Sequence, residues 1–485
     1  MKKYIGYSIL ALALSAGFTS CGSDFLDNDP HQQVDTDKAI TSAAELASAL
    51  NGIYYQMGRS QFVGRNLIAT GDVASDNSNH NGKTSHFYNI FNFAINENNA
   101  YLSDMWETGY KIIDFSTRAI LAGNKILAGE YGSISDADKA EVYAQLGQAY
   151  GLKAYATFMM ANVYALPYNS ANANAKGMVL VNEPIKPFEK VSRASLQETY
   201  DFVLDNITKA RECYAQKEVA SPNGYYMSSA AVEALAARVN LYMENFDQAA
   251  SAAQKSIDLK GGALIYDAAK YVALYDATDI NSEDIFVVGK AANDNLSANS
   301  LNTLWSNYGV SYSAELNKLY YTDTIKVDDK KVVVEDIRLP LVKTTGGKYK
   351  GLPNNAAVSN IPVFRLPEMY LILAEAKLAK GDIAGAQEAL LVVAKRNPTI
   401  EEVSDLPATK DDLLAFIIDE RRRELYPAGH RLFDARRLGL DMKVTNGTQL
   451  LDAEKFVFPI PNKEINSGMG VEQNEGWSQN LPTEL

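Results

Sequence analysis

Cysteine is nearly absent from this sequence: Cys21 and Cys213 are the only two among 485 residues. If Cys21 is used for lipid attachment, as argued below, Cys213 has no partner and no intrachain disulfide can stabilise the fold. Stability must then come from a hydrophobic core, and a chain of this length can bury a large one. Length alone would allow two or three domains.

Histidine and short catalytic motifs are also scarce. The four histidines are His31, His80, His86 and His430, and no two have the spacing that builds a metal site on a helix. The sequence has no GxSxG, P-loop or GxGxxG motif. We therefore expect no catalytic residue, no cofactor and no metal. A pair of catalytic carboxylates stays open, because 59 acidic residues offer many combinations that no motif reveals.

The chain begins with an apolar run that is too short to span a membrane. It covers Ile5 to Phe18, follows Lys2 and Lys3, and ends in Thr19 and Ser20 directly before Cys21. A spanning helix needs roughly 20 apolar residues, so residues 1–20 are predicted to be a signal peptide. Cleavage before Cys21 would allow lipidation there, and two or more acyl chains give stable anchoring in a membrane. The alternative is an ordinary secretory signal beside an unrelated cysteine.

Positive charge is in deficit, with 46 basic against 59 acidic residues and a net charge of −13. Removal of Lys2 and Lys3 with the signal peptide lowers it to −15. This charge disfavours nucleic acid and anionic membrane surfaces as partners. Residues 21–35 begin with an acidic, turn-rich stretch and are predicted to be a tether between lipid and folded body.

Helical periodicity is what the sequence has in abundance, so we expect a mainly α fold. Apolar and small residues recur at three- and four-residue spacings over 36–50, 101–127, 138–163, 193–213, 228–243, 246–259, 365–380, 383–396 and 410–425. Residues 237–249 align without gaps on 374–386, each as helix, short polar turn and helix. Small residues on facing sides are typical of tetratricopeptide-like helical hairpins.

Two long segments between the helices have a different composition, rich in Asn, Ser, Gly and aromatics. They cover 72–90 and 283–363. The second is predicted to contain a strand at 284–288, a hairpin of 325–327 with 331–334 closed by Asp328 and Asp329, and a turn at Gly346 and Gly347. Loops of this length are usually functional, and insertions on a helical-repeat scaffold are typical of binding proteins.

A cluster of acids and arginines runs from Asp419 to Leu425 and continues to Gly439. On a helix, Asp419 and Glu420 can each pair with Arg423, and a second helix is predicted over 431–438. The cluster could bind an anion, but a partly buried ion-pair network is the favoured interpretation, because the planar guanidinium suits such networks. Cys213 is predicted to be a small core residue.

Several blocks closely resemble the SusD/RagB family of Bacteroidetes. They are Cys21 to Asp27 with Pro30, Gly71-Asp72 with Ser75 to Asn77, Trp106 to Tyr110, Phe364 to Asp382, Asp419 to Leu425, Gly429 to Gly439, Phe458 to Ile465, and Gln473 to Gly476. The resemblance spans nearly the whole chain after the signal peptide, whereas residues 215–360 match only in layout.

This resemblance implies both a fold and a function. The fold would be four tetratricopeptide-like helical pairs with a loop-rich, partly β half, in one domain of residues 36–485 whose N-terminal and C-terminal portions cover 36–215 and 216–485. Family members face outward from the outer membrane as lids of a TonB-dependent transporter resembling SusC. There they capture glycans, or in some branches peptides, and they are not enzymes.

A glycan site needs flat apolar surfaces and planar polar groups that bridge neighbouring hydroxyls. Both long segments offer them, and the resemblance places ligand contacts in the same loops. The candidate binding residues are Asp76, Asn77, His86 and Tyr88 in the first segment and Trp305, Tyr308 and Tyr312 in the second. For each aromatic the alternative is burial in the core. Trp106 is predicted to be structural.

Three functions stay open from the sequence. The first is cell-surface binding of an oligo- or polysaccharide and its delivery to a SusC-like transporter. The second is a lipid-anchored glycoside hydrolase, and the third is a peptide-binding or protein-only adaptor of the helical-repeat type.

Overall fold

A computed structural model describes residues 39–220, 223–327, 330–344, 346–355 and 357–485. The predicted signal peptide, the tether with Cys21, and the turn residues Asp328 and Asp329 lie outside the described residues.

Long helices form most of the described chain. They are α2 (Ala43–Gly58), α5 (Ala100–Leu127), α6 (Asp136–Tyr164), α7 (Leu196–Tyr214), α8 (Ser229–Tyr242), α9 (Phe246–Lys260), α14 (Leu366–Ala379), α15 (Ile383–Ala394) and α16 (Lys410–Leu425). They confirm the predicted mainly α class. Both ends of the first helix were wrong, because it was expected over 36–50 and runs from Ala43 to Gly58. At its start the Ser42 hydroxyl caps the helix by accepting a hydrogen bond from the Glu45 amide.

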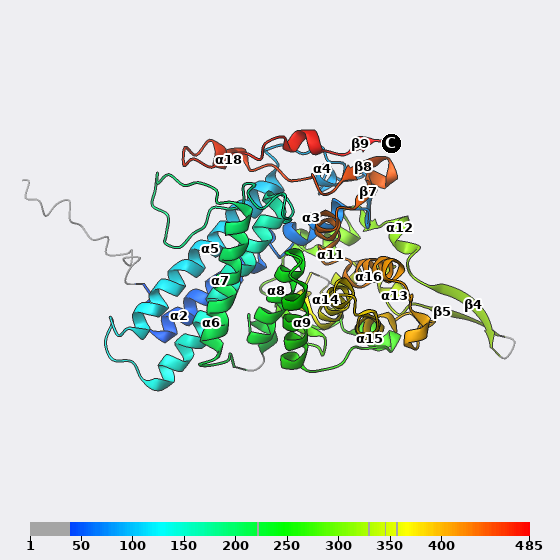
Figure 1. The fold of residues 1–485 in the computed structure, drawn as a ribbon, viewed down its shortest axis with the longest axis horizontal. Helices are drawn as coiled ribbons and strands as arrows, with labels where there is room; N and C mark the ends of the chain where they lie inside the picture. The colour runs from blue at the N-terminus through cyan, green and yellow to red at the C-terminus, as the bar shows by residue number, and fades with distance from the viewer. Residues whose placement is uncertain (1–38, 221–222, 328–329, 345, 356) are drawn as a thin grey trace, which may run out of the picture.

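These helices pack in consecutive pairs, as expected of tetratricopeptide-like repeats. The pairs are α2 with α5, α6 with α7, α8 with α9, and α14 with α15, and α9 also packs on α14 (Figure 1). Two glycines of α6 allow close approach: a Cβ on Gly147 would lie 2.6 Å from the Tyr214 ring, and one on Gly151 would lie 2.5 Å from Met227. The cost of an interior glycine is thus offset by helix packing.

The internal repeat predicted from residues 237–249 and 374–386 is present in three dimensions. Glu244 and Gly381 occupy the same place in the two helix–turn–helix units, and both have positive φ, 58° and 84°. In each unit the next residue donates a backbone hydrogen bond five residues back, from Asn245 to Asn240 and from Asp382 to Lys377. The two turns therefore have the same geometry despite their different residues.

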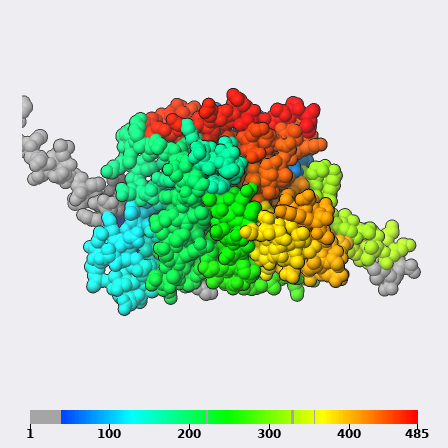
Figure 2. Space-filling view, viewed as in Figure 1, coloured from blue at the N-terminus to red at the C-terminus, as the bar shows by residue number. Residues whose placement is uncertain are grey.

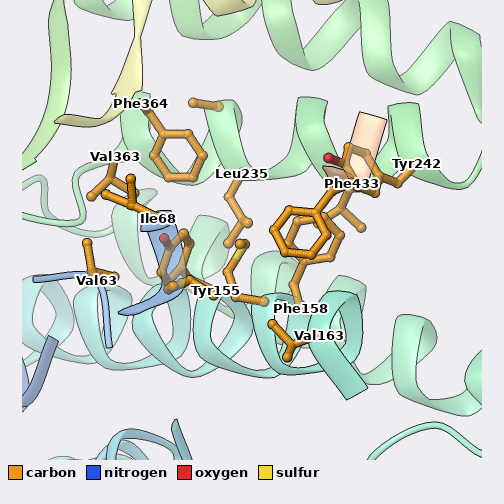
Figure 3. Close-up of a cluster of buried hydrophobic side chains, with 14 of the residues drawn as sticks. Val63, Ile68, Tyr155, Phe158, Val163, Leu235, Tyr242, Val363, Phe364 and Phe433 are labelled. Atoms are coloured by element: carbon orange, nitrogen blue, oxygen red, sulfur yellow. The ribbon is translucent and has the colours of Figure 1, made fainter. Parts of the chain in front are cut away.

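A continuous hydrophobic core joins the N-terminal helices to the C-terminal half. Tyr155 of α6 packs edge-on against Phe364 of β6 (Ile361–Arg365), and Phe158 of α6 and Leu235 of α8 lie in the same cluster (Figure 3). Ile68 of α3 (Asn66–Val73) and Phe433 of α17 (Arg431–Arg437) belong to the same cluster. Segments more than 350 positions apart in sequence are therefore held by one core.

The strands are short and scattered. β1 (Ser78–His80) pairs with β3 (Val310–Tyr312), β2 (Asp284–Val288) with β6, β4 (Thr322–Val327) with β5 (Lys330–Glu335), and β7 (Asp441–Val444) with β8 (Gln449–Asp452), which also pairs with β9 (Thr483–Glu484). The predicted strand at 284–288 and the predicted hairpin are confirmed. The β4–β5 hairpin projects from the body (Figures 1 and 2). The β7–β8–β9 sheet was not predicted, because strands of two to four residues are too short for a clear alternation.

Short helices complete the two long segments and the C-terminal region. They are α4 (Tyr88–Phe91), α10 (Ala268–Ala273), α11 (Leu301–Ser306), α12 (Ala314–Asn317), α13 (Leu339–Val342) and α18 (Asn462–Ile465). The segments expected to be elaborated loops are therefore built from brief helices and strands. Within the described residues, no helix combines the length and apolarity that a membrane crossing requires.

Candidate functional site

A two-stranded antiparallel ladder joins the two long segments that the sequence singled out. In it Ser78 lies opposite Tyr312, and Asn79 lies opposite Ser311. The ladder is extended beyond β3 by Ser313, whose amide donates to the Asn77 carbonyl at 2.8 Å. Tertiary pairing thus places candidate residues that are more than 200 positions apart in sequence on a single surface.

Aromatic rings and polar groups cover this surface. The His86 ring stacks on Tyr308 with centroids 3.6 Å apart and an interplanar angle of 2°. The Thr84 hydroxyl donates to the Tyr308 carbonyl at 2.7 Å, and the Tyr88 ring lies against His80. Exposed residues around these rings are Asn81, Lys83, Ser85, Asn89, Asn307 and Ser311. The arrangement combines flat apolar faces with hydrogen-bonding groups.

Asp76 and Asn77 are held by arginines beneath the ladder. Arg431 donates two hydrogen bonds to the Asp76 carboxylate, and Arg422 donates one to the Asn77 amide oxygen at 2.9 Å. Burial alone would raise the pKa of Asp76, but the hydrogen bonds and charge of Arg431, together with the charge of Arg422, lower it. The structure thus places both side chains in internal contacts that fix the loop, with Asn77 only 1% exposed.

A pocket of about 180 Å³ opens beside the ladder. It is lined by Trp305, Ser311, Tyr312, Val342, Lys343, Thr344, Gly347, Lys348, Tyr426 and Pro427. Trp305 is 9% exposed, and its indole N–H donates to the Tyr426 hydroxyl at 2.8 Å. Trp305 therefore contributes to the wall from a fixed position, whereas Tyr312 is partly exposed.

A buried ion-pair network lies under the pocket and confirms the favoured interpretation of the acid–arginine cluster. The Glu424 carboxylate forms ion pairs with Arg396, Arg365 and Arg338 at 2.5, 3.0 and 3.2 Å. Arg423 pairs with Glu420 at 2.7 Å, as predicted. The predicted Asp419–Arg423 pair was wrong: Asp419 pairs with Arg422 at 3.5 Å, because the Arg423 guanidinium is directed inward to Glu420.

Eight of the ten lining residues were not among the candidate binding residues, and they include Lys343, Thr344, Lys348 and Tyr426. Lys343 and Thr344 follow α13 in a stretch that has no periodicity, and Tyr426 ends the acid–arginine helix. None of them belongs to a motif, so only tertiary structure brings them to Trp305. Lys348 is buried, and desolvation lowers its pKa to about 7.

A larger pocket of about 420 Å³ lies elsewhere, between α5 and the segments near Val181 and Met469. Nine of its fifteen lining residues are apolar, and its charged residues on α5 pair with each other, Glu107 with Lys111 and Asp114 with Arg118. It therefore offers few free polar groups to fix a ligand. Trp106 is 3% exposed, packs edge-on against Tyr164 and borders this pocket, in agreement with a structural role.

Two further expectations concern metals and Cys213. In the described part of the chain, no group of three or more His, Cys, Asp or Glu side chains is arranged to hold a metal ion. Cys213 is buried in α7, as predicted, and desolvation raises the pKa of its thiol to about 11.

The fold and the site define a helical-repeat protein that presents an aromatic and polar pocket on a surface built from loops. Residues 306–477 match the profile of the "SusD family", and residues 24–241 match that of "Starch-binding associating with outer membrane". The chain belongs to the SusD/RagB family, as its sequence blocks predicted.

Individual relatives agree with this assignment. SusD-like protein P2 of Formosa agariphila is 24% identical over 98% of this chain and 100% of its own length. The starch-binding protein SusD of Bacteroides thetaiotaomicron is 27% identical over 80% of this chain and 65% of its own length. Among solved structures, a putative sugar binding protein from Bacteroides vulgatus has a TM-score of 0.78 at 24% identity and covers 90% of this chain and 99% of its own.

Proposed function

We propose that the protein binds a glycan at the pocket bordered by Trp305 and Tyr312 and delivers it, uncleaved, to a SusC-like TonB-dependent transporter. The observation that carries this proposal is the β1–β3 ladder, which joins both candidate loops beside the pocket. The relative named as a starch-binding protein supports glycan as the ligand class.

The pocket has the chemistry that sugars require. Tyr312 offers a partly exposed ring for the C–H face of a sugar, and Ser311 and Thr344 offer hydroxyl groups. Tyr308, His86 and Tyr88 would extend the contact along a longer chain. Asp76 and Asn77 would act by holding the loop in place rather than by touching the ligand.

The pocket wall also supports binding without cleavage. A glycosidase needs two carboxyl groups that flank the scissile bond. None of the described residues that line this pocket is an aspartate or a glutamate.

The N-terminal sequence and the family support the proposed location and partner. Lipid on Cys21 would anchor the chain in the outer membrane facing outward, and the family description "associating with outer membrane" supports this site of action. Residues 36–485 would form one folding unit over the transporter, since one core cluster extends from Leu46 to Trp477.

Isothermal titration against a panel of polysaccharides tests the binding site. Tyr312→Ala should weaken binding at least about tenfold, as loss of a central aromatic contact does. Tyr55→Ala, which removes an exposed tyrosine on α2, should not change it. Unchanged affinity in Tyr312→Ala would overturn the site.

Two further measurements distinguish glycan capture from a glycoside hydrolase and from a protein-only adaptor. Shortened glycan after incubation would show a hydrolase. If no glycan binds but a protein partner co-purifies, a protein-only adaptor would explain the fold better. Co-purification with a large outer-membrane transporter from native membranes would support the proposed partner.

A further inference from the structure

We infer that the glycan bound at this pocket is acidic, with a carboxylate or sulfate group held between Lys343 and Lys348. This inference rests on the proposed function and specifies its ligand class.

The first reason is the charge of the pocket wall. Two of its ten lining residues are lysines and none is acidic, although the whole chain carries a net charge of −13. The positive charge of the pocket lining is thus opposite in sign to the net charge of the chain. It favours an anionic ligand, because complementary potentials govern both orientation and specificity.

The second reason is that the Lys348 ammonium lacks a carboxylate partner. Its Nζ donates to the Glu424 backbone carbonyl, which satisfies one of its three N–H groups. The neighbouring Glu424 carboxylate is already shared by Arg338, Arg365 and Arg396. Within the described structure no acidic oxygen lies at ion-pair distance from Lys348, and a ligand anion would supply one.

The third reason is the position of Lys343 at the pocket mouth. Its side chain is 46% exposed and its contact with Glu335 is long, at 3.4 Å. An exposed pair of this kind is weak, so Lys343 can turn towards a bound anion at little cost. The Thr344 hydroxyl is engaged with the Pro340 carbonyl at 2.7 Å, which holds the backbone beside Lys343.

Binding should weaken as pH rises. Lys348 has a pKa near 7, so it loses its proton between about pH 6 and 8 and with it the charge that attracts the anion. Charged groups that act on it are Asp72 from α3, Glu424 from α16, Arg365 from β6, and Arg338 and Arg396. The arginines stay protonated over this range and Glu424 stays ionised, because its arginine partners hold its pKa well below the usual range. Asp72 has a raised pKa, about 7, and becomes negative over the same interval, which also disfavours an anion.

The experiment uses the full-length lipoprotein in detergent and matched pairs of polysaccharides. Polygalacturonate, alginate and hyaluronan are each compared with their carboxyl-reduced forms, chondroitin sulfate is compared with its desulfated form, and starch, xylan and laminarin serve as neutral glycans. We expect at least one acidic glycan to bind at least about tenfold more tightly than its neutralised form, since hydrogen bonds to charged groups are among the stronger ones. The preference should shrink from pH 6 to pH 8.5.

Variants identify the groups responsible. Lys343→Gln and Lys348→Gln should each remove most of the preference, and Lys139→Gln, which removes the same charge at the exposed start of α6, should leave it intact. Lys343 is exposed, so its variant tests the inference even if Lys348→Gln proves unstable. If only neutral glycans bind tightly, or if the preference for acidic glycans is unchanged in Lys343→Gln, the inference of an acidic ligand is wrong. The proposed glycan capture would still hold in that case. Failure of every glycan to bind would overturn both.

Discussion

Arg431 and Asp76 form a two-point ion pair across 355 positions of sequence, with Nε and Nη2 donating to the two carboxylate oxygens at 2.6 and 2.9 Å. Arg422 approaches the same carboxylate at 3.3 Å. The pair connects α17 to the segment that leads into β1. It therefore fixes one of the two loops that form the proposed binding surface.

Removal of this carboxylate should destabilise the protein strongly. Asp76→Ala leaves the largely buried Arg431 without its carboxylate partner and Arg422 with only Asp419, and breaking a buried pair costs about 3–5 kcal/mol. Urea unfolding measures the free energy directly, and glycan affinity should fall because β1 loses its support. Asp205→Ala, which breaks an exposed pair with Lys209, should cost under about 1 kcal/mol. Equal losses of unfolding free energy in Asp76→Ala and Asp205→Ala would contradict a stabilising role of the buried pair.

The repeat geometry predicts a stabilising substitution. Glu244 takes a left-handed conformation that the equivalent Gly381 adopts without a Cβ penalty. Glu244→Gly should raise the free energy of unfolding by up to about 1 kcal/mol, and Gly381→Ala should lower it by a similar amount. The melting temperatures of both variants test these two predictions. A shift in the same direction for both variants would argue against equivalent turns.

The buried thiol of Cys213 should be unreactive in the folded protein. Its raised pKa, about 11, leaves little thiolate at pH 8, and the thiolate is the reactive form. Alkylation by iodoacetamide should accelerate about a hundredfold on unfolding in urea. The Cys21→Ala background isolates this thiol, and equal rates in folded and unfolded protein would show that Cys213 is accessible.

His430 should make stability fall in mild acid. Burial lowers the pKa of this imidazole to about 4, below its ordinary value of 6.5, so the unfolded chain binds more protons between these pH values. The free energy of unfolding therefore rises with pH in that window, by at most about 1.4 kcal/mol per pH unit. The difference between wild type and His430→Gln, measured in urea from pH 4 to 7, isolates this group from the carboxylates. A difference that does not vary with pH would refute the burial of a neutral His430.

Cys21→Ala tests the proposed lipid anchor. Without lipid the protein should move from the membrane fraction to the soluble fraction, because the acyl chains supply the anchoring. Protease added to intact cells should digest the wild-type protein. Resistance to that protease would contradict the outward-facing location even if the lipid is present.

The sequence by itself determined the helical scaffold, since local periodicity and caps act over a few residues. The bounds of α16 and β2 were predicted to the residue, and the repeat around Glu244 was visible as an ungapped alignment. Family blocks such as Phe364 to Asp382 predicted the class of protein, because buried helix contacts restrict which residues can stand there.

Only the tertiary structure decided the site. Trp305 and Tyr312 were predicted, but the sequence could not show that the first is fixed by Tyr426 and the second is partly exposed. Lys348 is held at the pocket by its hydrogen bond to the Glu424 carbonyl of α16, and neither Lys343 nor Lys348 carries a local signal. The proposed binding surface depends on contacts between distant segments: the β1–β3 pairing joins the two loops, and Lys343, Lys348 and Tyr426 reach the pocket from elsewhere in the chain.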